Sequence, residues 1–171
     1  MRRRILSAQK VTELIDRLAE EIGRRNQDRK DLALVGIKRR GVPLAKRLAA
    51  RLGNCPVGAI DITLYRDDLQ LVAEAPIVRG SEIGFDITGK TLVLVDDVIF
   101  TGRTVRAALS ELLDYGRPRE IQLAVLVDRG HRELPIQPDF VGRRIETRRD
   151  DLVDIYLQET DGRDEVVLTR R

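Results

Sequence analysis

The 171-residue chain has little cysteine and few aromatic side chains: one cysteine, no tryptophan, and an aromatic content of 4%. The single Cys55 cannot form an internal disulfide, so we expect a cytoplasmic location. So few aromatic residues argue against binding of single-stranded nucleic acid by base stacking. No run of 18 apolar residues occurs, so we expect no segment that spans a membrane and no membrane partner.

Histidine is also scarce, since His131 is the only one. Without a second histidine or a cysteine cluster, the chain offers no zinc site. No Ser–His–Asp arrangement is indicated, and we expect no ATP-binding glycine loop. Taken alone, a single loop histidine is more often incidental than functional.

Arginine, in contrast, is abundant, and the formal net charge is +3 with a sequence pI of about 9.3. Several arginines come in pairs, such as Arg143-Arg144 and Arg148-Arg149. Most such pairs are solvated surface, but a phosphate-rich substrate and RNA both remain open as partners.

Apolar periodicity predicts strands that alternate with helices. We expect helices over 7–25, 43–52 and 103–115, with Ser7 capping the first. We expect strands over 32–37, 57–64, 91–96, 121–127, 152–157 and 165–168. This order is typical of an α/β fold with a mostly parallel central sheet flanked by helices. Residues 1–171 then form a single domain, with a flexible flap over about 65–88 and a small hood from about 128–171 with part of the N-terminus.

The most informative segment runs from Leu92 to Thr104, where an apolar strand meets Asp96-Asp97, a Thr/Gly turn and a helix. The turn and the helix N-terminus suit a phosphate. The two carboxylates suit ribose hydroxyls or a metal ion. Asp–Asp at a strand end can also be purely structural. The whole segment, however, resembles the 5-phosphoribosyl-1-pyrophosphate (PRPP) signature of type I phosphoribosyltransferases.

Two other segments fit a PRPP site. Lys38–Gly41 is a basic turn after a buried strand, which suits pyrophosphate or is a solvated surface turn. Arg66 opens the expected flap and is placed to close over the pyrophosphate, unless the flap is a plain surface hairpin. The expected PRPP-binding residues are Lys38, Arg39, Arg40, Gly41, Val95, Asp96, Asp97, Val98, Ile99, Phe100, Thr101, Gly102, Arg103 and Thr104, with Asp96, Asp97, Arg66 and Arg40 as the catalytic ones.

Together with Ile60–Asp68, Gly116-Arg117-Pro118 and Leu123–Ile136, these segments resemble the family of bacterial pyrimidine operon attenuation regulators that are also uracil phosphoribosyltransferases, the PyrR family. The resemblance implies the type I phosphoribosyltransferase fold. It also implies conversion of uracil and PRPP to UMP and pyrophosphate with Mg²⁺, which Asp96 and Asp97 contact indirectly through PRPP and water. The implied second role is binding of pyrimidine operon leader mRNA under the control of UMP or UTP, by a homodimer or higher homo-oligomer.

The resemblance also assigns two further groups of residues. By analogy with purine-handling relatives, the base lies against the 128–136 loop and the segment after Ile145, and Asp128, Arg129, His131 and Arg132 are the candidates. The RNA-binding candidates are Arg17, Arg132, Arg143 and Arg148. The first helix departs from the family, because Glu20 stands where a histidine is frequent, and Asp16 adds a second acid. Acids on this face repel phosphates, so a phosphoribosyltransferase without an RNA-binding role stays an alternative.

Position 100 bears on the choice of base. Purine-specific members of the superfamily carry a carboxylate there, and this chain has Phe100. No general base is therefore evident, and positioning of a fairly acidic uracil N1–H carries catalysis. An enzyme that uses a purine base is the remaining alternative.

Overall fold

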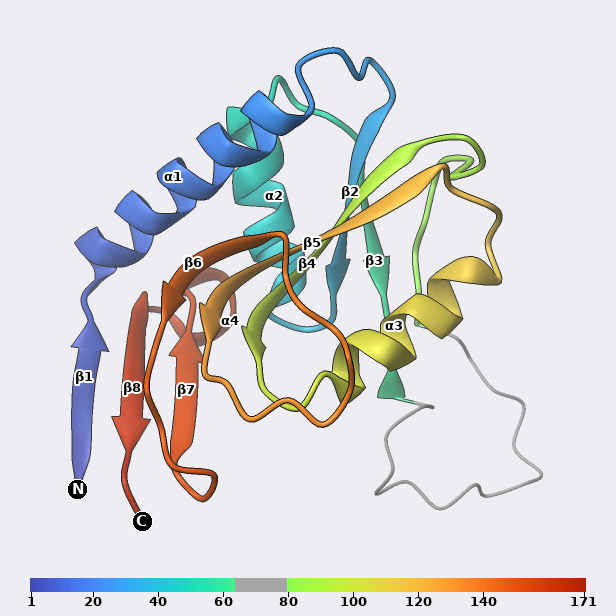
Figure 1. Ribbon diagram of the computed structural model, residues 1–171. Helices are drawn as coiled ribbons and strands as arrows, with labels where there is room; N and C mark the ends of the chain where they lie inside the picture. The colour runs from blue at the N-terminus through green and yellow to red at the C-terminus, as the bar shows by residue number, and fades with distance from the viewer. Residues whose placement is uncertain (64–79) are drawn as a thin grey trace.

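A computed structural model describes residues 1–63 and 80–171 of the chain. Five parallel strands form the central sheet in the order β3-β2-β4-β5-β6 (Figure 1). Their bounds are β2 Leu32–Ile37, β3 Val57–Ile60, β4 Thr91–Ile99, β5 Glu120–Asp128 and β6 Phe140–Arg144. The predicted α/β class with a mostly parallel sheet is confirmed.

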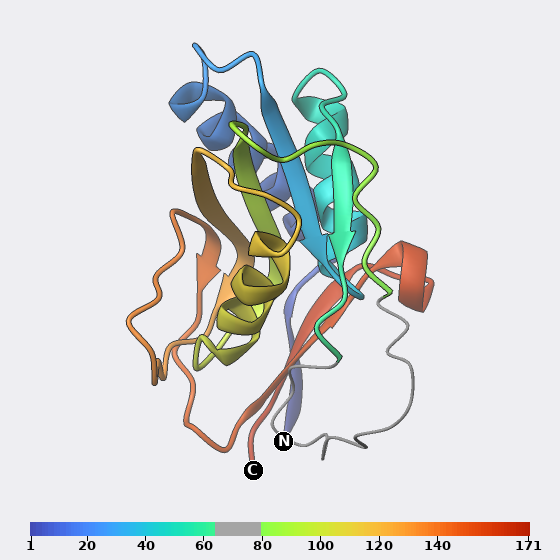
Figure 2. The same cartoon turned by 90° about the vertical axis from the view of Figure 1, so that its right-hand side faces the viewer.

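Helices cover both faces of this sheet. Helices α1 (Ala8–Arg25) and α2 (Gly41–Arg51) pack on one face, and α3 (Arg103–Leu113) packs on the other, as Figure 2 shows. Alternate residues of β4 serve the two cores: Val93 and Val95 join the α1–α2 core, whereas Leu92 and Leu94 join the α3 core. This division explains the unbroken apolar run of the strand, because a central parallel strand is buried on both faces.

A second, antiparallel sheet forms the hood, which consists of β1 (Arg2–Leu6), β8 (Glu165–Thr169) and β7 (Leu152–Tyr156), together with the one-turn helix α4 (Gln158–Asp161). β8 lies between β1 and β7, so the two ends of the chain are side by side (Figure 1). The hood is narrower than expected, because β6 falls within 128–171 and yet belongs to the central sheet.

Several predicted boundaries hold and others shift. Ser7 caps α1 as expected, and its Oγ accepts the N–H of Lys10 at 3.4 Å. The strand expected at 57–64 ends at Ile60, and α2 begins at Gly41 rather than at Pro43. β1 and β6 were not predicted. β1 is an arginine-rich edge strand without an apolar run, and β6 has only five residues, one of them Gly142.

Only residues 80–88 of the expected flap, 65–88, belong to the described part of the chain. There Glu82 forms a bridge with Ala59, and Ile87 is fully buried in the α3 core. Within 1–63 and 80–171, no helix has both the length and the apolarity needed to cross a lipid bilayer.

Candidate functional site

One polar cavity of about 220 Å³ lies at the carboxyl ends of β2 and β4. Because these strands are parallel neighbours, the segments that follow them open at the same edge of the sheet. The cavity is lined by Ile37, Lys38, Arg39, Arg40, Asp96, Asp97, Val98 and Thr104. Two segments that lie some sixty residues apart in the sequence thus meet in one site.

The basic loop 38–41 forms one wall of the cavity. Its Lys38–Arg39 peptide bond is cis, and the Lys38 Nζ donates a hydrogen bond to the carbonyl of Gly80. Gly41 then begins α2, and an added Cβ at this glycine would lie 2.3 Å from the carbonyl oxygen of Val95. A side chain at position 41 is therefore excluded by the close approach of α2 to β4, next to Asp96.

The two acids line the same cavity, and they still belong to β4. We expected the strand to end at Asp96, but it continues to Ile99, where it pairs with Asp128 of β5. The Asp96 Oδ1 accepts the N–H of Asp97 at 2.9 Å, and the Asp97 Oδ1 accepts the N–H of Val98 at 2.8 Å. These bonds hold both carboxyl groups at the strand edge. Burial raises the pKa of Asp97 above its ordinary value.

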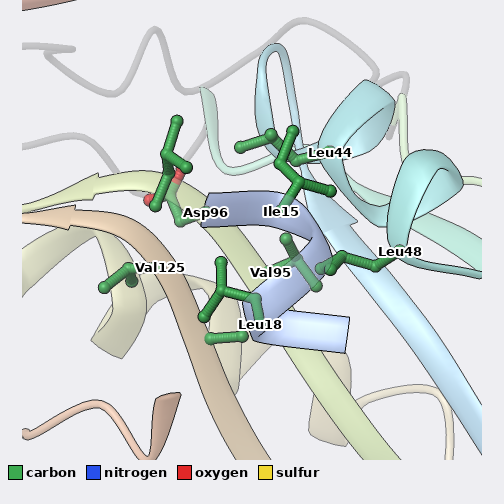
Figure 3. Close-up of a pocket in the computed structure, with 9 residues that line it drawn as sticks. Ile15, Leu18, Leu44, Leu48, Val95, Asp96 and Val125 are labelled. Atoms are coloured by element: carbon green, nitrogen blue, oxygen red, sulfur yellow. The ribbon is translucent and has the colours of Figure 1, made fainter. Parts of the chain in front are cut away.

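Asp96 also borders an apolar cavity on the α1–α2 face of the sheet. Side chains of both helices and of β4 and β5 line this cavity, among them Ile15, Leu18 and Leu44, and Asp96 is the one polar residue of the nine that do so (Figure 3). Asp96 is only 6% exposed. The apolar surroundings leave the polar cavity as the side on which its carboxylate can meet a solute.

The turn 100–102 leads into α3 as the sequence predicted. Gly102 has φ +93° and caps the helix, a conformation that favours glycine. Thr101 Oγ1 accepts the N–H of Arg103 at 3.3 Å, and Thr104 lines the polar cavity. The first N–H groups of an 11-residue helix therefore face the region where a phosphate is expected. Arg103 itself lies 3.6 Å from Glu133.

In the loop 128–136, two expected base contacts, Asp128 and Arg132, pair with each other and are buried; we call this pair the clamp. Arg132 donates to the Asp128 Oδ2 at 2.7 Å, to the carbonyl of Phe100 at 2.8 Å and to that of Ile136 at 2.9 Å. The side chains of Arg132 and Asp128 are only 12% and 8% exposed. Their partners tie β5 to the Phe100 turn, which is not the arrangement expected for contacts to a base or to RNA.

Arg129 and His131 instead surround the Phe100 ring. The guanidinium of Arg129 stacks 4.0 Å from the ring centroid and donates to the carbonyl of Arg148 at 3.0 Å. Burial lowers the pKa of Arg129. The His131 ring meets Phe100 edge-on at 5.9 Å, with Nε2 2.7 Å from the carbonyl of Thr147. The structure thus brings Arg129 and His131 together at Phe100.

The RNA-binding candidates separate into two groups. Arg17 donates to the carbonyl of Gly142, which places this residue of α1 beside Arg143 on β6. Arg143 and Arg148 are exposed. Arg132 lies apart, in the clamp described above. Arg66 falls within 64–79, outside the described residues.

Two features escaped the sequence reading. Asp161 of α4 pairs with Arg40, and no local signal marks two residues that lie 121 positions apart.

Gly84–Thr91 matches the Gly-x4-Gly-Lys-Thr spacing of an ATP-binding loop. That segment leads into β4, however, and Thr91 is fully buried as its first residue. An ATP-binding loop is followed by a helix, so the spacing alone does not make this segment one.

Comparison with known proteins agrees with this architecture. The family model described as "Phosphoribosyl transferase domain" matches residues 1–158. A hypoxanthine phosphoribosyltransferase from Staphylococcus aureus superposes with a TM-score of 0.75 at 20% identity, covering 99% of this chain and 91% of that one. A purine phosphoribosyltransferase from Pyrococcus horikoshii Ot3 gives 0.64 at 29% identity, covering 82% and 85%.

Two relatives are similar over nearly their whole length. The "Bifunctional protein PyrR" of Chloroflexus aurantiacus is 57% identical, covering 98% of this chain and 95% of the relative. That of Roseiflexus sp. is 56% identical, covering 94% and 90%. The chain thus belongs to the phosphoribosyltransferases and, within them, to the family of bifunctional PyrR proteins.

Proposed function

We propose that this protein is a uracil phosphoribosyltransferase, which converts uracil and PRPP to UMP and pyrophosphate, and that it also regulates pyrimidine operons by binding leader mRNA. The observation that carries the enzymatic role is the polar cavity that residues of the 38–41 loop line together with Asp96, Asp97 and Thr104. The cations of this loop match the pyrophosphate of PRPP, and the two carboxylates match the ribose hydroxyls.

The chemistry follows from this placement. The 5-phosphate binds at the turn 100–104 and the N-terminus of α3, and the ribose hydroxyls donate to Asp96 and Asp97. The pyrophosphate binds at Lys38–Gly41, with Arg40 as a cationic partner. As the bond between C1′ and the pyrophosphate oxygen breaks, the oxygen takes the electron pair. Uracil N1 forms the new bond to C1′, and its proton leaves to the departing pyrophosphate or to solvent. Cations preorganised around the leaving group stabilise its developing charge.

The donor set fits Mg²⁺ that arrives with the substrate. Among residues 1–63 and 80–171, no group of three or more His, Cys, Asp or Glu side chains is placed to hold a metal. Two neighbouring carboxylates at the phosphate site are nevertheless typical of Mg²⁺, which uses one or two carboxylates and completes its shell with water and phosphate oxygens. When bound, the ion neutralises charge on the pyrophosphate. Asp96 and Asp97 would hold it through PRPP and water.

Phe100, Arg129 and His131 form the proposed base pocket. None of the three is a carboxylate that could act as a general base, and the pocket therefore favours uracil, a flat pyrimidine. The direct test is UMP formation from PRPP with a panel of bases. Turnover of uracil with no turnover of hypoxanthine or guanine is expected. The reverse preference would replace the uracil assignment with a purine one.

The regulatory role rests on Arg17, Arg143 and Arg148. Asp16, one of the acids expected to repel RNA, is paired with Arg51 and is partly neutralised. Glu20 remains an exposed acid on the same helix. We expect leader RNA to bind more tightly with UMP or UTP present, and with a steep dependence on salt concentration. Binding that ignores both nucleotide and salt would remove this role but leave the enzyme.

We also propose that the protein acts in the cytoplasm as a homodimer or higher homo-oligomer, because the family resemblance implies an assembly. Sedimentation of the purified chain with and without UMP measures the assembly state. A strictly monomeric protein at micromolar concentration would contradict this part of the proposal.

A further inference from the structure

Arg40, at the pyrophosphate end of the cavity, is held by a carboxylate that comes from the hood. Its Nη2 donates to the Asp161 Oδ1 at 3.0 Å, and its Nε donates to the Asp161 Oδ2 at 3.3 Å. The two side chains are 34% and 16% exposed. A carboxylate so close to the proposed pyrophosphate site neutralises part of the positive charge that the substrate could otherwise bind, so its presence calls for an explanation.

We propose that Asp161 is a positioning residue for Arg40: it holds the guanidinium side-on, so that the remaining N–H groups face the departing pyrophosphate. The inference rests on the proposed function and names a residue of that same site. Neither the PRPP motif nor the basic loop contains Asp161.

The shape of the guanidinium supports this role. A guanidinium is planar with five donors in fixed directions, so a side-on carboxylate at Nε and Nη2 sets the direction of Nη1. Among the described residues no hydrogen bond from Nη1 of Arg40 is found. The charge of Asp97 also contributes to the raised pKa of Arg40, after the hydrogen bond to Asp161. Arg40 therefore lies between the hood and the acids of the site.

Asp161 is itself held in place. Its Oδ2 accepts the N–H of Leu157 at 2.9 Å and the hydroxyl of Thr160 at 2.7 Å. Although burial opposes ionisation, hydrogen bonds from Arg40, Thr160 and Leu157 lower the pKa of Asp161 to about 2. The carboxylate is thus fixed and charged throughout the neutral range.

A second arginine anchors the same turn and provides a matched control. Arg47, two turns further along α2, donates to the Glu159 Oε2 at 2.6 Å and to the Asp164 Oδ1 at 2.8 Å. These ion pairs also join the hood to α2, but Arg47, Glu159 and Asp164 do not line the polar cavity. Glu159→Gln therefore weakens the attachment of the hood without touching Arg40.

The alternative hypothesis is that Asp161 competes with pyrophosphate for Arg40. The two hypotheses predict opposite signs for Asp161→Asn, because removal of a competitor lowers the KM for PRPP, whereas loss of a positioning group raises it. We expect a rise of about tenfold in the KM for PRPP, comparable to the smaller losses seen when a partner of a metal-binding side chain is removed, with the KM for uracil within twofold.

The experiment compares initial rates of the wild-type protein, Asp161→Asn and Glu159→Gln over PRPP and uracil concentrations. Glu159→Gln should keep the wild-type KM for PRPP even if its Tm falls as much as that of Asp161→Asn. In an Arg40→Ala background, Asp161→Asn should add no further loss, because nothing is left to position. A KM for PRPP that is unchanged or lower in Asp161→Asn, or equal losses in both single variants, would overturn the proposal.

Direct titration separates this inference from the proposed function. Calorimetry with PRPP and Mg²⁺, without any base, measures binding where no turnover is possible. If the wild-type protein binds PRPP but makes no UMP from uracil, the proposed function fails, and the tenfold weaker binding expected of Asp161→Asn can still be tested. If Asp161→Asn binds PRPP as tightly as the wild-type protein while UMP forms, the inference fails alone.

Discussion

Gly41→Ala gives the sharpest test of how the backbone positions the proposed PRPP site. The added Cβ would lie 2.3 Å from the Val95 carbonyl oxygen and 3.4 Å from the Asp96 Cα. The neighbour is backbone in the middle of a buried strand, so no rotamer change can relieve the contact. Separation to 3.0 Å, below which real Cβ contacts are essentially absent, requires α2 and β4 to move apart by 0.7 Å.

This displacement has two measurable effects. Overpacking of this kind costs about 1–3 kcal/mol, which corresponds to a fall in Tm of about 2–12 °C. Because the contact lies between the 38–41 loop and Asp96, the site also widens, and a shift approaching 1 Å is expected to lower kcat/KM for PRPP by about 10- to 100-fold.

The assay pairs thermal unfolding with UMP formation at varied PRPP. Gly84→Ala is the control, because nothing lies within 4 Å of its added Cβ. The control should keep the wild-type Tm within about 2 °C and the wild-type activity within twofold. A Gly41→Ala protein with wild-type Tm and activity would show that the loop does not depend on this close approach, and the account of the site's walls would be refuted.

Three other predictions concern charge. Because burial raises the pKa of Asp97, its ionised form destabilises the fold at neutral pH. Asp97→Asn should therefore raise the Tm at pH 7.5, and raise it less at pH 4, while UMP formation falls by at least about 100-fold. A lower Tm at pH 7.5 would contradict this. Arg132→Leu breaks the buried ion pair with Asp128 and should lower the free energy of unfolding, measured with urea, by about 3–5 kcal/mol. Loss of RNA affinity at unchanged stability would instead show that Arg132 contacts RNA. The lowered pKa of Asp161 contributes stability that is lost as pH falls toward about 2, so the Tm of Asp161→Asn should vary less between pH 4 and 2 than that of the wild-type protein. Equal slopes would remove the ion pair from the acid response.

The sequence by itself determined the α/β class and marked the loops that we propose to bind PRPP. Strands such as β4 are apolar on both faces, and the Thr/Gly turn before α3 and the basic turn after β2 depend on local conformational preferences that a short segment carries. Such signals do not depend on what lies far away in the chain, so the segments could be recognised before any contact was known. The clustering of the 38–41 loop and Asp96 also followed, because parallel strands open their carboxyl ends at one edge.

Tertiary structure alone decided what each charged side chain does. Arg132 and Arg143 are equally basic in sequence, yet one is clamped to Asp128 and the other is exposed. Arg40 meets Asp161 only because the hood returns to α2. The role of a charge depends on its desolvation and on its partner, and both are set by residues far along the chain.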